Sequence, residues 1–249
     1  MKFIIMWARS VLWASLVLWG IICPPFCFGA AAEAVSGAAQ YTAELTYRSD
    51  RGEDFPIGSA SLLRETESGA YRVRLDFALG RAGTFSAILR PEEKTLFVVS
   101  YGLSAYVTIP TRGDERAAAD LLPSVAAAFM PFGVPALTIR EEKREVLPTA
   151  SVDGLPCKRE RTLYRVTFMG DASDVALGEW NCSRLPFLPV RVDELRSWDD
   201  PDSFRGAVLL KNIRSGGLDM GKELFEVPEG YTRYGSALNM LLYALAAQW

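Results

Sequence analysis

The stretch that decides the fold is Tyr71-Arg-Val-Arg-Leu-Asp-Phe-Ala-Leu79. Its apolar positions are Tyr71, Val73, Leu75, Phe77 and Leu79, and they alternate with Arg72, Arg74, Asp76 and Ala78. Successive side chains of a strand point to opposite faces of a sheet. This period of two therefore predicts a strand with one apolar face and one largely polar face.

The same period recurs along the chain. It is seen in Leu103, Ala105, Val107 and Ile109, in Tyr164, Val166 and Phe168, and in Val190 and Val192. Further strands are expected near residues 41–48, 57–64, 84–90, 95–100, 137–146, 175–182 and 205–213. Short turns rich in glycine, proline and aspartate separate them, so that consecutive strands should pair antiparallel. The sequence predicts a mainly β domain over residues 35–235: a strongly curved antiparallel sheet, or half-open β-barrel, of about ten strands.

Two segments depart from this period. Residues 114–132 are rich in alanine and leucine and predict a central helical insertion, kinked at Pro123. Residues 236–249 carry no charged side chain and begin with Ser236, a suitable N-cap for a C-terminal helix. A helix that is apolar nearly all round must be covered, so this one should pack either on the sheet or on a partner.

Residues 1–34 have the pattern of an export signal. A basic start is followed by an uncharged apolar stretch, which a pair of prolines ends before a run of small residues. This pattern predicts a signal peptide cleaved near Ala32 or Ala34, and hence a periplasmic protein. The alternatives are an uncleaved membrane anchor and lipid attachment at Cys23 or Cys27.

Two cysteines, Cys157 and Cys182, remain after such cleavage. In an oxidising compartment an even pair predicts a disulfide, and these two flank a predicted strand-turn-strand unit. The bond would close a loop of about 26 residues, which the chain-entropy treatment makes worth ~3 kcal/mol. Two buried free thiols are the alternative.

The residues available for chemistry are few. The chain has 249 residues, a formal net charge of −3 and no histidine, which excludes Ser-His-Asp triads, Cys-His pairs and His-ligated zinc. No basic face suggests nucleic-acid binding, and no phosphate-loop or nucleophile-elbow motif occurs. Asp199, Asp200 and Asp202 lack calcium-loop spacing and indicate a solvated turn. We therefore expect no enzyme activity, no metal and no cofactor.

Arg72 and Arg74 share the polar face of the strand quoted first. We expect that face to be exposed to solvent, as is common for one side of an antiparallel sheet. An anionic headgroup or a partner protein that meets the two arginines is the alternative.

Three C-terminal motifs carry a resemblance to a known family. They are Ser151-Val-Asp-Gly-Leu-Pro-Cys-Lys158 with Tyr164-Arg-Val-Thr-Phe168, Trp180 with Leu188-Pro-Val-Arg-Val192, and Leu209-Leu-Lys-Asn-Ile213 with Phe225-Glu-Val-Pro-Glu-Gly-Tyr231. In this order they resemble strands and turns of the LolA/LolB-like superfamily of periplasmic lipoprotein-localisation proteins. The likeness spans most of residues 41–233. The tail 236–249 lies beyond the family's usual closing turn, and the Cys157/Cys182 pair is not a feature of the lipoprotein carrier itself.

The resemblance implies a half-open β-barrel covered by helices, and a carrier role in the periplasm. Together with the apolar strand faces, it favours a monomeric, non-enzymatic envelope protein that holds an acyl chain, lipid or lipoprotein in its concave face. The expected lining residues are Val73, Leu75, Phe77, Leu103, Val107, Ile109, Tyr164, Val166, Phe168, Leu241 and Leu245. Three alternatives stay open: helices that merely complete the core, helices that dock on an envelope partner or membrane surface, and a His-free hydrolase that uses carboxylates.

Overall fold

The computed structural model describes residues 40–64, 69–78, 80–114, 121, 124, 138–168, 171–215 and 220–247. The predicted signal peptide, and the central helical segment except for residues 114, 121 and 124, lie outside this part of the chain. Within the described part, no helix combines the length and the apolar character that crossing a bilayer requires.

The described residues form a twelve-stranded sheet. Its strands are β1 (Gln40–Ser49), β2 (Asp54–Arg64), β3 (Tyr71–Ala78), β4 (Thr84–Arg90), β5 (Thr95–Ser100), β6 (Ala105–Pro110), β7 (Thr138–Val152), β8 (Leu155–Phe168), β9 (Asp171–Asn181), β10 (Arg191–Leu195), β11 (Phe204–Ser215) and β12 (Thr232–Arg233). Short 3-10 turns occupy Gly80–Ala82 (η1), Pro91–Glu93 (η2) and Lys222–Phe225 (η4), and the helix α3 spans Ala237–Ala246.

Strand order across the sheet is β12-β6-β5-β4-β3-β2-β1-β11-β10-β9-β8-β7. Consecutive strands from β1 to β6 and from β7 to β11 pair antiparallel, as expected from their short turns. The two halves join where β1 pairs with β11, also antiparallel. At one edge β12 runs parallel to β6, so the sheet is mixed, and sequence periodicity gave no signal for this two-residue strand.

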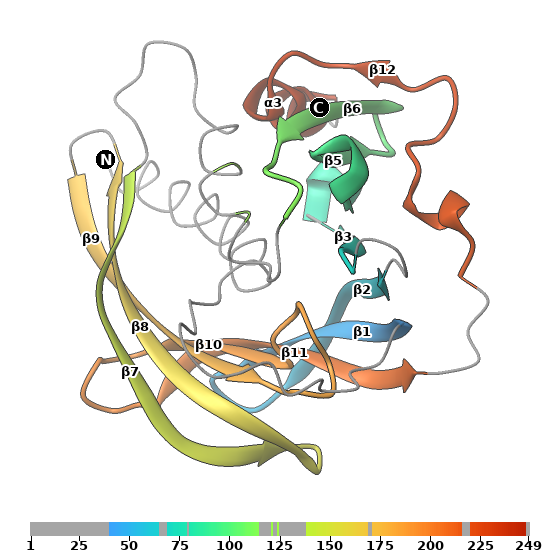
Figure 1. The fold of residues 1–249 in the computed structure, drawn as a ribbon. Helices are drawn as coiled ribbons and strands as arrows, with labels where there is room; N and C mark the ends of the chain where they lie inside the picture. Colours follow the sequence, from blue (N-terminus) through green and yellow to red (C-terminus); the bar gives the residue numbers. More distant parts are fainter. Residues whose placement is uncertain are drawn as a thin grey trace.

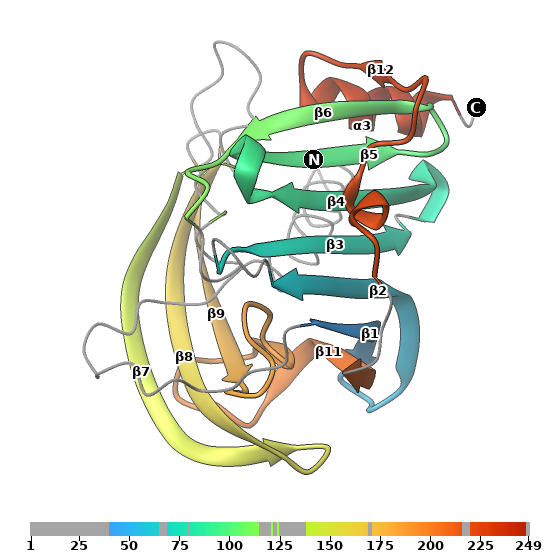
Figure 2. The ribbon, with the colours of Figure 1, turned by 45° about the vertical axis from the view of Figure 1, so that its right-hand side comes forward.

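The sheet is open and strongly curved, with β1 and β11 at its floor and β7–β9 rising on one side (Figures 1 and 2). Bulges in β1, between Thr42 and Glu44 and between Leu45 and Thr46, give local bends at the floor. Opposite the second bulge, a Cβ on Gly58 would lie 1.8 Å from the carbonyl oxygen of Asp76, so only glycine fits there. The predicted fold class, a curved half-open sheet with a C-terminal helix, is confirmed.

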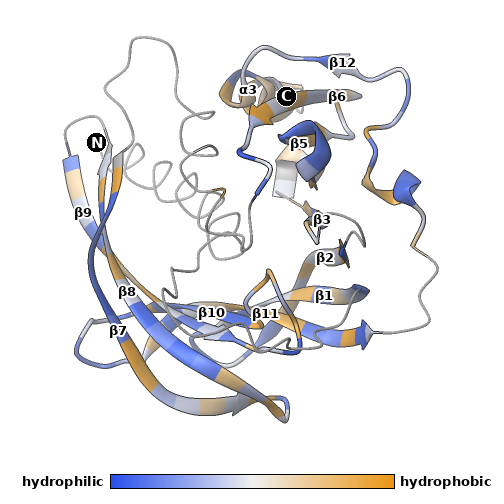
Figure 3. Cartoon of the chain, viewed as in Figure 1, coloured by the Kyte–Doolittle hydropathy of each residue, from blue (hydrophilic) through white to orange (hydrophobic). Residues whose placement is uncertain are grey.

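The two faces of the sheet carry different covers. On the inner, concave face lie α3 and residues 182–190, whose apolar side chains join the main core. On the outer face of β3–β6 lies the segment from η4 to Tyr231, hereafter the closing segment, which packs on Ile88, Phe97 and Val99. The middle of β8 is hydrophilic, in contrast to the apolar inner positions of β1–β6 (Figure 3).

Candidate functional site

The concave face of β1–β6 is a continuous apolar surface built from alternate strand positions. Val73, Leu75 and Phe77 of β3 and Val107 and Ile109 of β6 are all buried in one core cluster. Their cross-strand neighbours on β2, β4 and β5 present leucine, alanine, valine and phenylalanine to the same side. Five of the expected lining residues therefore lie together, at the positions that the period of two assigns to one face.

The other expected lining residues do not all lie in this core cluster. Leu103, Leu241 and Leu245 are partly buried and pack against the same cluster. Tyr164 and Val166 form a second, smaller cluster with Leu177, further along β8 and β9. The side chain of Phe168, at the end of β8, lies outside the described residues.

Residues 182–190 fold over the concave face and were not assigned to the site from sequence. Leu185, Phe187 and Leu188 of this segment, hereafter the cover segment, are buried in the main cluster. The Tyr41 hydroxyl donates a hydrogen bond to the carbonyl oxygen of Pro186 at 3.2 Å, and burial raises the pKa of that hydroxyl. An apolar run interrupted by Pro186 and Pro189 was the available signal, because proline cannot take part in a central strand ladder.

Helix α3 lies beside β5 and β6 at the upper end of the concave face (Figure 1). Ser236 is its N-cap, as predicted, and accepts a hydrogen bond from the Asn239 backbone NH at 3.3 Å. Met240 is buried in the main cluster, whereas Leu242 and Tyr243 are 40% and 60% exposed. The helix therefore fills part of the core and still presents large apolar side chains to solvent.

A small pocket opens between the sheet floor and the cover segment. It encloses about 220 Å³, open solvent included, and it is lined by Leu45, Leu188, Pro189, Val192, Val208, Leu209 and Leu210. The enclosed part of this space accommodates about one water molecule. In this conformation the described residues therefore leave no room for an acyl chain unless part of the lining is displaced.

A polar patch adjoins this pocket on the same face. Glu160 of β8 lies directly opposite Glu179 of β9, and both side chains are buried. Burial raises the pKa of the Glu179 carboxyl well above its usual 4.5; the neighbouring Glu160 raises it further, and Arg144 opposes the rise. Sequence alternation alone could not find this pair, because it depends on which residues of two strands stand opposite each other.

We expected the face that carries Arg72 and Arg74 to be exposed to solvent. It is not, because the closing segment covers it. Arg72 is 5% exposed and forms an ion pair with Glu92. Arg74 donates to the carbonyl oxygen of Leu224 at 2.8 Å and to the Tyr101 hydroxyl at 2.7 Å. The two guanidiniums thus fix the closing segment and the adjoining turn instead of meeting a headgroup.

The same network holds a Ser86–Asp76 hydrogen bond, the arrangement in this region that most resembles an activated nucleophile. The Ser86 side chain is fully buried, under the closing segment. No substrate reaches a hydroxyl in that position, so the contact is structural. Among the residues that the structure describes, no group of three or more acidic or cysteine side chains could hold a metal ion.

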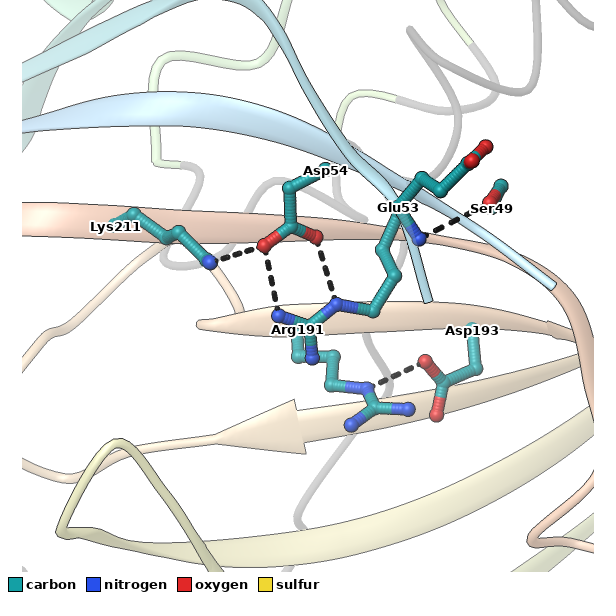
Figure 4. Close-up of polar contacts among 7 residues, drawn as sticks. Ser49, Glu53, Asp54, Arg191, Asp193 and Lys211 are labelled. Carbon is teal, nitrogen blue, oxygen red and sulfur yellow. Dashed lines mark hydrogen bonds and ion pairs between the residues drawn. The ribbon is translucent and has the colours of Figure 1, made fainter. Parts of the chain in front are cut away.

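The outer face at the sheet floor is charged (Figure 4). Asp54 accepts hydrogen bonds from Arg48, at 2.7 Å, and from Lys211, and both lower the pKa of its carboxyl. Nearby, Arg191 bonds Asp193 at 2.6 Å, and burial raises the pKa of the Asp193 carboxyl despite this contact. At the floor, the sheet therefore has a charged outer face opposite the apolar side chains that line the pocket.

Cys157 and Cys182 are both buried and are present as free thiols. The Cys157 thiol donates to the carbonyl oxygen of Leu155 at 3.2 Å; burial raises its pKa, and the neighbouring Cys182 adds to the rise. The two residues flank the β8–β9 hairpin, as the sequence suggested, and Cys182 begins the cover segment. Their predicted disulfide stays a prediction, tested below.

Comparisons with known proteins found matches among solved structures. No protein-family model matches the chain, and no curated protein matches it. The chain is similar to LprF from Mycobacterium bovis, with 12% identity, a TM-score of 0.31 and coverage of 88% of this chain and 97% of that one. It is similar to a DUF1329 family protein from Desulfovibrio piger (12% identity, TM-score 0.34, coverage 77% and 91%). A LolA superfamily protein from Nitrosomonas europaea matches at 11% identity and a TM-score of 0.19, with coverage of 86% and 97%.

Proposed function

We propose that this chain is an exported, non-enzymatic and monomeric protein of the cell envelope that binds a hydrophobic ligand, an acyl chain of a lipid or lipoprotein, against its concave face. The observation that carries the proposal is the continuous apolar surface of β1–β6, covered by segments rather than by a second sheet. Apolar surface of this kind is the usual lining of a small-molecule site.

The arrangement of the covers supports binding. Side chains of the cover segment and of α3 close the concave face, while the sheet keeps its own ladder of hydrogen bonds. A ligand that displaces the side chain of Leu188 or Leu241 would take over its apolar contacts with the concave face. The apolar area that is buried would then change little. The pocket between Leu188 and Val208 is where such displacement would begin.

Export is the second part of the proposal and rests on residues 1–34. A signal peptide cleaved near Ala32 or Ala34 would deliver the chain to the periplasm. N-terminal sequencing of the protein recovered from the envelope should begin at Glu33 or Val35. A protein that retains Met1 would instead be anchored and would contradict this part.

Mass spectrometry of lipids extracted from the natively purified protein tests the binding proposal. Val208→Phe narrows the pocket and should lower the recovered lipid at least tenfold, because added volume in a packed site is poorly tolerated. Ala172→Phe is the matched control, since Ala172 is exposed on β9 opposite Thr167, on the other face of the sheet from the pocket, and it should retain the lipid. Recovery of no lipid from the unsubstituted protein would contradict the proposal.

A second candidate function follows from the exposed side chains of α3. Leu242 and Tyr243 form an apolar surface on a helix without charged residues, which suits docking on an envelope partner or a membrane surface. A Leu242→Ser/Tyr243→Ser double variant should stay folded and bind lipid. Loss of a cross-linked envelope partner in that variant, with lipid retained, would favour this function over ligand carriage.

A further inference from the structure

The cover segment, residues 182–190, connects β9 to β10 and is fixed to the sheet at both ends. It begins directly after Asn181, the last residue of β9. At its other end the Val190 NH donates to the carbonyl oxygen of Trp180 at 2.9 Å, and the Val190 carbonyl oxygen accepts from the Leu210 NH at 2.9 Å. The residues between these ends form a loop that stands on the concave side of the sheet floor (Figure 2). Movement of this loop therefore leaves the strand ladder in place.

The tip of the cover segment is a tight turn centred on Phe187. The Leu188 NH donates to the carbonyl oxygen of Pro186 at 3.0 Å, and φ of Phe187 is +75°. A hydrogen bond across three residues with a positive φ at the central one is the rarer form of γ-turn, which is strained. A bulky side chain seldom adopts a positive φ because its Cβ approaches the carbonyl oxygen that follows. Such a backbone persists only where surrounding contacts hold it.

Two prolines concentrate this strain at one position. Pro186 and Pro189 fix their own φ angles, and each also restricts the residue before it, Leu185 or Leu188. Phe187 is therefore the residue of the tip whose backbone changes most freely. The prolines carry no NH group, so lifting the tip from the sheet exposes fewer donors that require a partner.

Apolar contacts hold the tip against the concave face. Leu185, Phe187 and Leu188 are buried in the main cluster, and the centroid of the Phe187 ring lies 5.6 Å from that of Tyr71. Leu188 and Pro189 form one wall of the pocket whose other wall is the sheet floor. The contacts that oppose the strain are thus of the kind that a hydrophobic ligand makes.

We propose that residues 183–189 form a lid hinged at Cys182 and Val190, and that the strained turn at Phe187 favours its opening when a hydrophobic ligand enters. When the lid lifts, Phe187 returns to a negative φ and the ligand takes the place of its ring beside Tyr71. A ligand shifts such an equilibrium by binding one state better than the other, and here the difference is the apolar surface that the closed lid hides. This inference rests on the proposed function and adds the segment that controls access.

Two substitutions at one position isolate the backbone strain, because both remove the ring. Phe187→Gly accepts a positive φ without strain, whereas Phe187→Ala does not. The closed lid is therefore more stable in the glycine variant. That variant should bind cis-parinaric acid, a fatty acid that fluoresces in apolar sites, about fivefold more weakly than the alanine variant does. Fluorescence titration of the two purified proteins measures this ratio.

Asp153 provides the matched control. It has a positive φ of +49°, and it is exposed in the turn between β7 and β8, outside the lid. Asp153→Gly should again be more stable to unfolding than Asp153→Ala, but the two variants should bind the fatty acid equally. A difference in affinity as large as that at Phe187 would show that strain acts through overall stability, and it would overturn the inference.

Amide hydrogen exchange gives a readout that needs no ligand. In the unsubstituted protein the Leu188 amide should exchange at least about tenfold faster than the Leu210 amide, because the lid opens without unfolding of the sheet. Equal exchange of these two amides, or equal affinities of the two Phe187 variants, would overturn the inference and leave the proposed function intact. Failure of the unsubstituted protein to bind the fatty acid would overturn both.

Discussion

Arg74 ties the closing segment to the sheet through side-chain hydrogen bonds. Its guanidinium reaches Asp76, the Tyr101 hydroxyl and the carbonyl oxygen of Leu224. Arg74→Ala leaves these partly buried acceptors without their donor, which should cost about 2 kcal/mol of unfolding free energy. Urea denaturation followed by circular dichroism measures this change.

An exposed ion pair provides the control for that measurement. Arg165 and Asp174 lie 3.2 Å apart, and each side chain is 51% exposed. Pairs of this kind contribute about 0–1 kcal/mol, so Arg165→Ala should change the unfolding free energy by less than about 0.5 kcal/mol. Equal effects of the two substitutions would show that Arg74 does not fix the closing segment.

Glu179 should make stability depend on pH in a defined direction. Its folded pKa lies well above the usual 4.5, chiefly because of burial. Below pH 4.5 the carboxyl is protonated in both states; above it, the unfolded chain ionises first, so stability falls as pH rises toward the folded pKa. Glu179→Gln removes this loss. Denaturation curves from about pH 4 to about pH 8 should show that the unfolding free energy of the variant increases relative to that of the unsubstituted protein as pH rises. Parallel curves would contradict the expectation.

Residue-level sequence reasoning succeeded where local alternation decides the outcome. Val73, Leu75 and Phe77 share the concave face because strand geometry alone places them there. Arg74 was expected on an exposed face, and its burial comes from contact with Leu224, 150 residues away in the chain. No local pattern contains such a contact, and the pairing of Glu160 with Glu179 is hidden for the same reason.

At the scale of elements, α3 combines two roles that single substitutions can separate. Met240 is 1% exposed within the main cluster, whereas Leu242 is 40% exposed. Met240→Ala should cost about 2–4 kcal/mol because it leaves a cavity, and Leu242→Ala should cost less than about 1 kcal/mol. Thermal and urea unfolding of the two variants compare these values. A small cost for Met240→Ala would mean that α3 is not part of the core.

Elements with a strong local signal were predicted, and elements defined by their partners were not. Ser236 and an uncharged apolar run were sufficient to place the C-terminal helix. By contrast, the cover segment and β12 have no period of their own and are defined by what they pack against or pair with. Strands β7 and β8 continue well beyond their alternating cores, because charged and proline-containing residues there are held by their neighbours in the ladder.

For the whole molecule, the cysteine pair offers a test of the compartment. Protein recovered from the envelope without reductant should have lost two hydrogens relative to the reduced protein, through a Cys157–Cys182 disulfide, as intact mass measures. The bond would join the start of β8 to the start of the cover segment and stabilise the fold by ~3 kcal/mol in the chain-entropy treatment. Cys157→Ser/Cys182→Ser should then lower the midpoint of thermal unfolding. An unchanged mass and midpoint would leave two buried thiols as the correct description.

The pairing of β1 with β11 has a kinetic consequence. The floor of the sheet joins residues near 45 with residues near 210, so its ladder cannot close until almost the entire chain is available. Folds that depend on such distant contacts form slowly, because the entropy of closing a long loop is lost before the contacts are gained. Export of the kind proposed above would require the chain to cross a membrane unfolded, and slow folding would favour that step. The strand pairing that shapes the concave face would then also delay folding until after export.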